Sequence, residues 1–261
     1  VAFACAPMKI ITSEREFVDD ESLDVNEMVE YLDKYKGKSK SSCPNTVDWL
    51  DAFGDADDIF CFTITSSLSG SYNSACAAKQ IYESENEGKR VLVIDTLSTG
   101  PEIALAIEKV EELVEAGMTY EEICKSITQY IKRTGLLFML KSLKSLANNG
   151  RVSPIAAKLV GIVGIGVVGK ASNEGTLEQM HKCRGERRAL ETIVTDLEAE
   201  GFRSGKISIG HCRNESAALQ LKELILSKFK NAMIEIHKLR GLCSFYAENG
   251  GVLVGFEKAP V

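Results

Sequence analysis

The sequence lacks three features that would each mark a class of protein. Its longest apolar run covers residues 159–169 and contains four glycines, whereas a membrane-spanning helix needs about 20 apolar residues. Basic residues nowhere form a run of five, and 31 Lys and Arg stand against 37 Asp and Glu. Proteins that neutralise a nucleic-acid backbone concentrate positive charge instead. We therefore expect no transmembrane segment and no nucleic-acid partner.

The eight cysteines are spread singly, with no C-x-x-C pair. Zinc sites and the disulfide frameworks of small secreted domains usually show paired or regularly spaced cysteines. A chain of 261 residues also has enough apolar material to bury a core without cross-links. We therefore expect reduced thiols, no metal site and a cytoplasmic protein.

Common catalytic and cofactor motifs are missing or out of context. His181, His211 and His237 are far apart in the sequence, so no single helix presents two of them at the i, i+4 spacing of a metal site. The sequence contains no G-x-S-x-G elbow and no P-loop. Residues 164–169 match G-x-G-x-x-G, but a turn rather than a helix follows, so a pyrophosphate would meet no helix dipole. We expect no cofactor.

What is present is the alternation that is typical of an α/β protein. From residue 58 onward, short apolar runs alternate with longer amphipathic stretches, as in β-α-β crossovers. This pattern predicts strands at residues 58–64, 90–94, 135–139, 206–210, 232–237 and 252–256, and helices at residues 70–83, 186–200 and 214–229. Capping boxes that begin at Thr99 and Thr119 predict two further helices.

The character of the sequence changes after Gly150. Residues 152–169 are rich in glycine and β-branched residues, and residues 172–175 predict the turn of a hairpin. No low-complexity linker separates the two parts. We therefore expect two packed α/β domains, residues 1–150 with a mainly parallel sheet and residues 151–261 with a mixed sheet.

The segment of residues 65–75 is the richest in hydroxyl groups. Five hydroxyls lie between the end of a predicted strand and the first turn of the next helix, at the sheet edge where α/β proteins bind ligands. Free N–H groups and the helix dipole favour an anion there. An ordinary helix cap would explain one serine but not five hydroxyls. We interpret the segment as a binding site for a carboxylate or a phosphate.

Other candidate features are ambiguous by themselves. Residues 40–46 form a second hydroxyl-rich turn, which an ordinary Ser-Pro turn before a helix explains equally well. Arg151 and Arg184 have charged neighbours and would by default be solvated. The apolar residues 159–168 fit either a core or the lining of a pocket.

Six segments resemble the DegV family in order and spacing, a family that includes the fatty-acid-binding subunits of bacterial fatty acid kinase. They are residues 7–10, 41–44, 65–75, 93–95, 143–153 and 182–185. The resemblance covers nearly the whole chain. It implies a two-domain α/β protein that encloses one long-chain fatty acid between its domains, without cofactor or metal. It also implies a separate kinase that phosphorylates the bound carboxylate, while this subunit supplies no chemistry.

The resemblance further implies which residues bind the ligand. The family's Thr-Ser pair falls on Ser41 and Ser42, and its helix-cap serine falls on Ser69. Tyr246 stands where many members have a histidine, so a phenol hydroxyl would replace an imidazole. The complete expected set is Ser41, Ser42, Ser67, Ser69, Gly70, Ser71, Arg184 and Tyr246.

Two other interpretations stay open at this point. An enzyme could act on a carboxylated or phosphorylated small molecule at the same helix terminus, although no His, Lys or carboxylate pair lies nearby in the sequence to serve as a base. A structural interaction module would use the hydroxyls only as caps. The family also usually opens with a strand ending in Asp-Ser well before the segment of residues 7–10, so we expect a further segment ahead of Val1.

Overall fold

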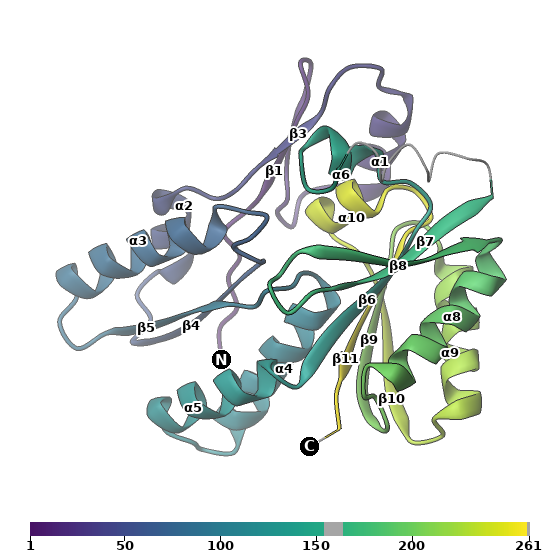
Figure 1. Ribbon diagram of the computed structural model, residues 1–261. Coiled ribbons are helices and arrows are strands. Elements are labelled where there is room, and N and C mark those ends of the chain that lie inside the picture. The colour runs from purple at the N-terminus through teal and green to yellow at the C-terminus, as the bar shows by residue number, and fades with distance from the viewer. Residues whose placement is uncertain (154–163, 260–261) are drawn as a thin grey trace.

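The computed structural model describes residues 1–153 and 164–259 and contains a six-stranded mixed sheet (Figure 1). The strands lie in the order β10-β9-β11-β6-β7-β8. Only β9 and β10 are parallel neighbours in this sheet, and the other described pairs are antiparallel. The bounds are β6 (Thr134–Leu140), β7 (Ile165–Ala171), β8 (Leu177–Arg184), β9 (Gly205–His211), β10 (Ala232–Lys238) and β11 (Val252–Glu257).

The inner strands of this sheet are buried on both faces. In β6, Leu137 and Met139 belong to the core that α8 (Glu186–Ala199) and α9 (Glu215–Lys228) cover. Phe138, between them, belongs to the core on the opposite face. Burial on both faces explains why β6 appears in the sequence as a continuous apolar run rather than as an alternating one.

A smaller parallel unit precedes the large sheet. Its two strands, β4 (Asp58–Thr63) and β5 (Arg90–Asp95), pair in parallel. Its helices are α2 (Thr46–Phe53), α3 (Ser71–Glu85), α4 (Pro101–Glu115) and α5 (Tyr120–Ile131). Helices α2 and α3 share one core with this pair, and α4 and α5 share another. The loops that follow β4 and β5 therefore meet at one edge.

A three-stranded antiparallel sheet completes the architecture, in the order β2-β1-β3. Its strands are β1 (Lys9–Ile11), β2 (Glu16–Val18) and β3 (Lys40–Ser42), and the neighbouring helices are α1 (Val25–Lys34), α6 (Lys144–Asn148) and α10 (Gly241–Ala247) (Figure 1). Each strand has three residues, too few to show a periodicity. The sequence pattern accordingly predicted none of them.

The predicted α/β class is confirmed, with a small parallel sheet and a larger mixed one. The predicted hairpin is also confirmed: β7 and β8 are antiparallel, and the Gly175 N–H donates to the Ser172 carbonyl at 2.9 Å. Because β8 follows β7, the glycines of residues 164–169 precede no helix terminus. The predicted apolar pocket or core segment lies partly outside the described residues, which omit 154–163. The division at Gly150 stays a prediction.

One of the two predicted capping boxes is confirmed. Thr119 accepts the N–H of the residue three positions later, whose side chain accepts the Thr119 N–H in return. The box predicted at Thr99 is wrong, because Gly100 is the N-cap of α4 and no side chain caps that helix. Glu102 turns inward instead and accepts a hydrogen bond from the Thr134 hydroxyl at 2.6 Å. Burial of the glutamate thus replaces the local cap.

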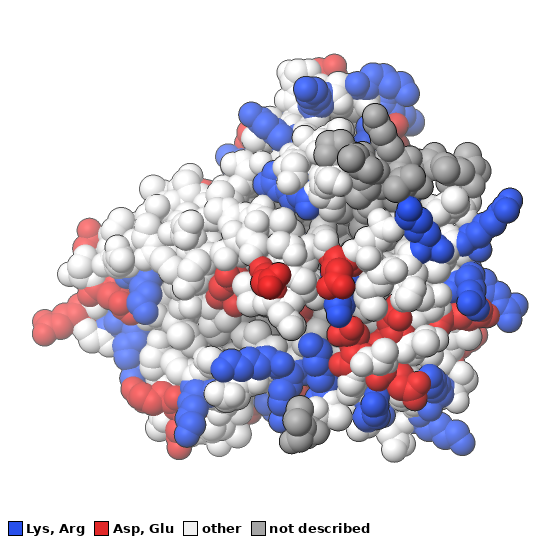
Figure 2. All heavy atoms as spheres, in the orientation of Figure 1, with Lys and Arg blue, Asp and Glu red and all other residues white. Residues whose placement is uncertain are grey.

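The outer surface carries both signs of charge. Figure 2 shows Lys and Arg side chains gathered at the edge beside α8 and β8. Within the described residues, no helix combines the length and the apolar character needed to span a bilayer.

Candidate functional site

A cavity of about 330 Å³ lies between the small parallel unit and the large sheet, a volume within the range of small-molecule sites. Its walls come from the ends of β3, β4 and β5, from β6, from the β7–β8 turn and from α10. Much of the lining is apolar, and its large aliphatic and aromatic members include Leu68, Leu97, Leu136, Phe138, Leu140, Leu146, Leu177, Leu242 and Leu253. Such a surface can bury a hydrocarbon.

The loop after β4 brings hydroxyls to this cavity. Its backbone is held to the loop after β5, because the Thr65 N–H donates to the Ser98 carbonyl at 2.9 Å. The Asp95 carboxylate adds a second tie by accepting the Ser66 N–H at 3.1 Å. Residues far apart in the sequence are therefore fixed at the carboxyl edge of the parallel pair, as the predicted topology requires.

The same loop ends at the start of α3. Gly70 is the N-cap and provides no side-chain cap. The Ser69 hydroxyl accepts the Ser71 N–H at 3.2 Å and lies 2.9 Å from the Ser71 hydroxyl. Both hydroxyls thus sit at the positive end of the helix dipole, where an anion is favoured.

Two more hydroxyls come from the N-terminal sheet and from α10. Ser41 Oγ lies 2.7 Å from Tyr246 Oη, and this contact joins residues that are 205 positions apart. The Ser42 hydroxyl makes a longer bond of 3.3 Å to the Cys43 carbonyl. That weak local bond leaves Ser42 able to turn toward a ligand.

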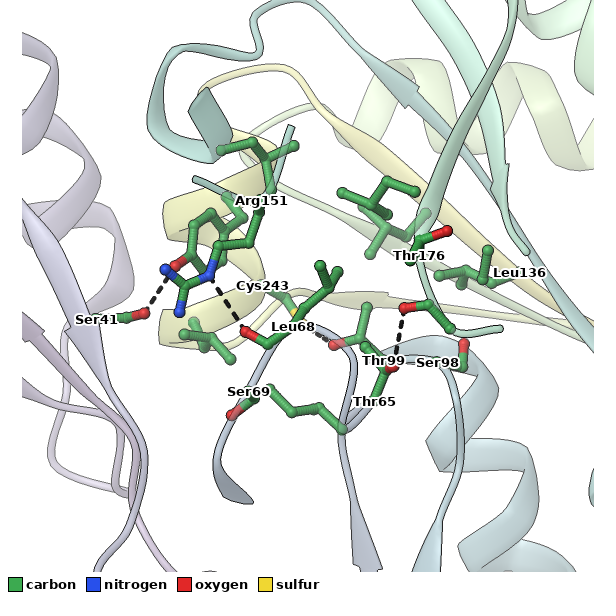
Figure 3. A pocket seen from close by; sticks show the side chains of 18 of the residues that line it. Ser41, Thr65, Leu68, Ser69, Ser98, Thr99, Leu136, Arg151, Thr176 and Cys243 are labelled. Carbon is green, nitrogen blue, oxygen red and sulfur yellow. Dashed lines mark hydrogen bonds between the residues drawn. The ribbon is translucent and has the colours of Figure 1, made fainter. Parts of the chain in front are cut away.

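Arg151 is the only charged side chain among the described lining residues. Its Nε donates to the Leu68 carbonyl at 3.2 Å, and its Nη1 donates to the Asn149 carbonyl. Figure 3 shows the guanidinium pointing toward Ser41, within the polar part of the cavity. An acidic ligand therefore meets one permanent positive charge and no described carboxylate on this wall.

The β7–β8 turn closes one side of the cavity by bonding to the serine loop. The Thr65 hydroxyl donates to the Gly175 carbonyl at 2.8 Å, and the Ser67 hydroxyl donates to the Glu174 carbonyl at 2.5 Å. Gly175 has a φ of +75°, and a Cβ there would lie 2.1 Å from Thr65 Oγ1. Glycine is thus required both by the backbone conformation and by the close approach.

The structure brings most of the predicted ligand-binding residues together. Those that line the cavity are Ser41, Ser42, Ser69, Gly70 and Tyr246. Ser71 joins them through its contact with Ser69. Ser67 is not part of the described lining and bonds the hairpin instead. Arg184 is an exposed residue of β8 and also lies outside that lining. The individual binding roles stay predictions.

The sequence interpretation missed several lining residues, including Thr65, Thr99, Thr176 and Cys243. The sequence predicts a helix cap at Thr99, but its hydroxyl lies 3.5 Å from Cys243 Sγ. Burial raises the pKa of the Cys243 thiol to about 11, so this group is neutral at physiological pH. Contacts such as Thr99–Cys243 depend on the tertiary fold. The only signal for them in the sequence is the high hydroxyl content of the loops.

The described lining lacks the side chains that usually act as a base. It contains no histidine, lysine, aspartate or glutamate, so the hydroxyls have no neighbouring base. In the described part of the chain, no cluster of three or more His, Cys, Asp or Glu could hold a metal ion. The arrangement is chemically suited to holding an anion with an apolar tail.

The sequence is similar to known proteins over nearly its whole length. The model of the DegV family, described as a family of uncharacterised proteins, matches residues 2–259. A DegV domain-containing protein of Streptococcus pneumoniae is 42% identical over 255 residues, which are 98% of this chain and 91% of that protein.

Solved structures resemble the chain over nearly its full length. A DegV family protein from Eubacterium eligens, loaded with heptadecanoic acid, has a TM-score of 0.95 at 41% identity and covers 97% of this chain and 92% of its own. The Fatty Acid Kinase (Fak) B3 protein of Streptococcus pneumoniae, loaded with linoleic acid, has a TM-score of 0.95 at 42% identity, with 97% and 90% covered.

Proposed function

The chain belongs to the DegV family, and from this premise we propose that it binds one long-chain fatty acid in the cavity between the small parallel unit and the large sheet. The observation that carries the proposal is the pairing of an apolar wall with a hydroxyl-rich, positively charged end. A fatty acid likewise has an apolar chain and an anionic carboxylate end. The fatty acids present in the E. eligens and S. pneumoniae proteins support the assignment.

The acyl chain supplies most of the binding free energy. About 14 methylenes at ~0.8 kcal/mol each give on the order of 11 kcal/mol of transfer free energy. Lost translational and conformational freedom offsets several kcal/mol of this gain. Desolvation of the carboxylate would add a further cost if no donors met it. The polar end of the cavity therefore decides whether the acid is retained.

We assign the carboxylate to the hydroxyls of Ser42 and Ser69 and to the N–H groups near Gly70. Ser41 and Tyr246 form the adjacent hydroxyl pair, and Arg151 supplies the positive charge. Charge-assisted hydrogen bonds of this kind are about twice as strong as neutral ones. They also keep the carboxylate at a helix N-terminus, where its ionised form is favoured.

The protein holds the acid and leaves its chemistry to a partner. The described lining offers hydroxyls without a base, so it is suited to binding rather than to turnover. The similarity to Fak B3 supports a partner of the fatty acid kinase type, which would phosphorylate the presented carboxylate. A small-molecule enzyme at the same helix terminus would need a base that this wall does not provide.

Native mass spectrometry of the purified protein tests the proposal. We expect one bound long-chain fatty acid per chain, released on denaturation and identified by its mass. Delipidated protein should then regain a single equivalent of oleate or palmitate. A bound water-soluble metabolite, or failure to take up either fatty acid, would contradict the proposal.

A further inference from the structure

A second cavity, of about 290 Å³, lies at the carboxyl ends of the parallel strands β9 and β10. His211 ends β9, Lys238 ends β10, and the two residues are direct partners in the strand register. Residues 20, 21 and 23–26, just before and at the start of α1, also line it. No described residue lines both this cavity and the fatty-acid cavity. Ligands of α/β proteins bind outside the carboxyl ends of parallel strands.

His211 is one of the residues that line this cavity. Only 4% of the residue is exposed, and its Nδ1 accepts the Asn214 N–H at 3.3 Å. The neutral ring therefore carries its proton on Nε2. Burial lowers the pKa of His211 and favours this neutral form. No described hydrogen bond uses Nε2, so this N–H is free to donate to a ligand.

Three cationic residues also line this cavity, Arg213, Lys238 and Arg240. Lys238 makes no ion pair with any carboxylate in the described ranges. Arg213 uses Nη2 for Glu30 at 2.9 Å and retains its other donors. Arg240 Nε lies 3.8 Å from Asp19 Oδ1, too far for a strong hydrogen bond. Positive charge is thus available at the strand ends.

The backbone at Arg213 is strained. Its φ is +52°, in the left-handed region that costs a non-glycine residue on the order of 1 kcal/mol or more. Such conformations cluster at binding sites, where the surrounding fold fixes the direction of a side chain.

Three acidic residues also line this cavity, Asp20, Glu21 and Asp24, and two of them bond to the chain beside them. Asp24 caps α1 by accepting the Asn26 and Glu27 N–H groups at 2.9 and 3.0 Å. Asp20 accepts the N–H and O–H of Ser22 at 2.9 and 2.6 Å. These bonds use part of the accepting capacity of Asp20 and Asp24, and the remaining lone pairs of the carboxylates can accept from hydroxyl groups.

We propose that this second cavity binds a small phosphate monoester. Lys238, His211 and Arg213 donate to the phosphate oxygens, because donors from two strand ends and the following loop can converge on a tetrahedral anion. The hydroxyl-bearing part of the ligand faces the wall that contains Asp20 and Asp24. The site is separate from the fatty-acid cavity and does not depend on the function proposed for it.

Isothermal titration with glycerol 1-phosphate at low ionic strength tests this assignment. We expect saturable binding that weakens at least about tenfold in Lys238→Gln, because one charge-assisted hydrogen bond contributes that order of magnitude. Lys230→Gln is the matched control: Lys230 is also exposed, but it lies before the opposite end of β10. This control should bind as tightly as the unaltered protein. The His211 imidazole resonances should shift during the titration.

Three results would overturn the proposal. The first is the absence of saturable binding together with unmoved His211 resonances. The second is an equal loss in Lys238→Gln and Lys230→Gln, which would indicate general charge attraction. The third is that inorganic phosphate binds as tightly as the ester, which would leave an adventitious ion only. Oleate binding by the same samples should be unchanged, so failure of this site is distinguishable from failure of the fatty-acid proposal.

Discussion

At the scale of single residues, the polar end of the fatty-acid cavity depends on hydroxyls that have weak or shared local partners. Ser42 makes only a 3.3 Å bond to the Cys43 carbonyl among its described contacts. Ser69 shares its hydrogen-bonding capacity with Ser71. Such groups can reorient toward a carboxylate at little cost to the fold, because the bonds they give up are long or replaceable.

Replacing both serines tests their role directly. We expect Ser42→Ala combined with Ser69→Ala to weaken oleate binding by roughly 1–3 kcal/mol for each lost hydrogen bond to the charged carboxylate. Fluorescence or calorimetric titration of delipidated protein measures the change. Ser84→Ala is the control, since Ser84 is an exposed serine of α3 that bonds the Ile81 carbonyl. Unchanged affinity in the double variant would remove both serines from the site.

Tyr246 provides a second test at this scale. Its hydroxyl is 2.7 Å from Ser41 Oγ, so Tyr246→Phe removes one bond while retaining the ring. We expect oleate affinity to fall by about 0.5–1.5 kcal/mol, the order of one hydrogen bond, because the Tyr246 hydroxyl would no longer hold Ser41 Oγ in place beside the carboxylate. Ser41→Ala should cause a similar loss, and the double variant should lose little more than either single one. Fully additive losses would show that the two hydroxyls act independently.

At the scale of elements, the β7–β8 turn acts as a wall of the cavity that is held by few contacts. Thr65 and Ser67 donate to the carbonyls of Gly175 and Glu174. Residues 175–177 also line the cavity. Movement of the turn would therefore break these bonds and open the site to solvent.

Gly175→Ala should loosen this turn. The new Cβ would lie 2.1 Å from Thr65 Oγ1, at a φ of +75°. Gly117→Ala is the matched control, because Gly117 has a φ of +74° with no atom within 4 Å of a Cβ. Both variants should lose about 1 kcal/mol from the backbone, but only Gly175→Ala adds a steric cost of about 1–3 kcal/mol. Hydrogen exchange in the hairpin and oleate release should be faster in Gly175→Ala alone.

Most long elements could be predicted because their signal is local. The continuous apolar run of β4 and the reciprocal cap at Thr119 are each contained in a few neighbouring residues. The hydroxyl-rich loop between β4 and α3 is predictable for the same reason, because its serines and threonine are close together in the sequence. By contrast, the three-residue strands carry no period, and a cap at Thr99 was predicted where burial of Glu102 determines the local structure. A local sequence pattern does not show when a contact with a distant part of the chain replaces a local cap.

The cavity could be predicted only in part. Ser69 stands out because it belongs to a dense hydroxyl segment beside a helix start. The sequence does not single out Arg151 in this way. Its place in the lining depends on a contact between its guanidinium and the Leu68 carbonyl, 83 positions away. The Ser41–Tyr246 contact spans still more of the chain. Its positions came from resemblance to a family rather than from the pattern of residues.

At the scale of the whole molecule, Glu102 links the small parallel unit to the large sheet. It lies in α4 and accepts the Thr134 hydroxyl at the start of β6. Only 7% of the residue is exposed. Burial raises the pKa of its carboxyl above the ordinary value, although the hydrogen bond from Thr134 acts in the opposite direction. The packed state therefore favours the protonated acid.

The raised pKa predicts a pH-dependent effect of Glu102→Gln on stability. The pKa of a glutamate carboxyl in the unfolded chain is near 4.3. If folding raises this pKa, the folded state loses stability as the pH rises above that value. Urea unfolding should therefore show nearly equal free energies for the variant and the unaltered protein at about pH 4. At about pH 8 the glutamine variant should be more stable, because it retains an acceptor for Thr134 without the buried charge. Glu111→Gln, an exposed change in the same helix, should show no such trend. A glutamine variant that is less stable at every pH would mean that ionised Glu102 stabilises the packing of α4 on the sheet.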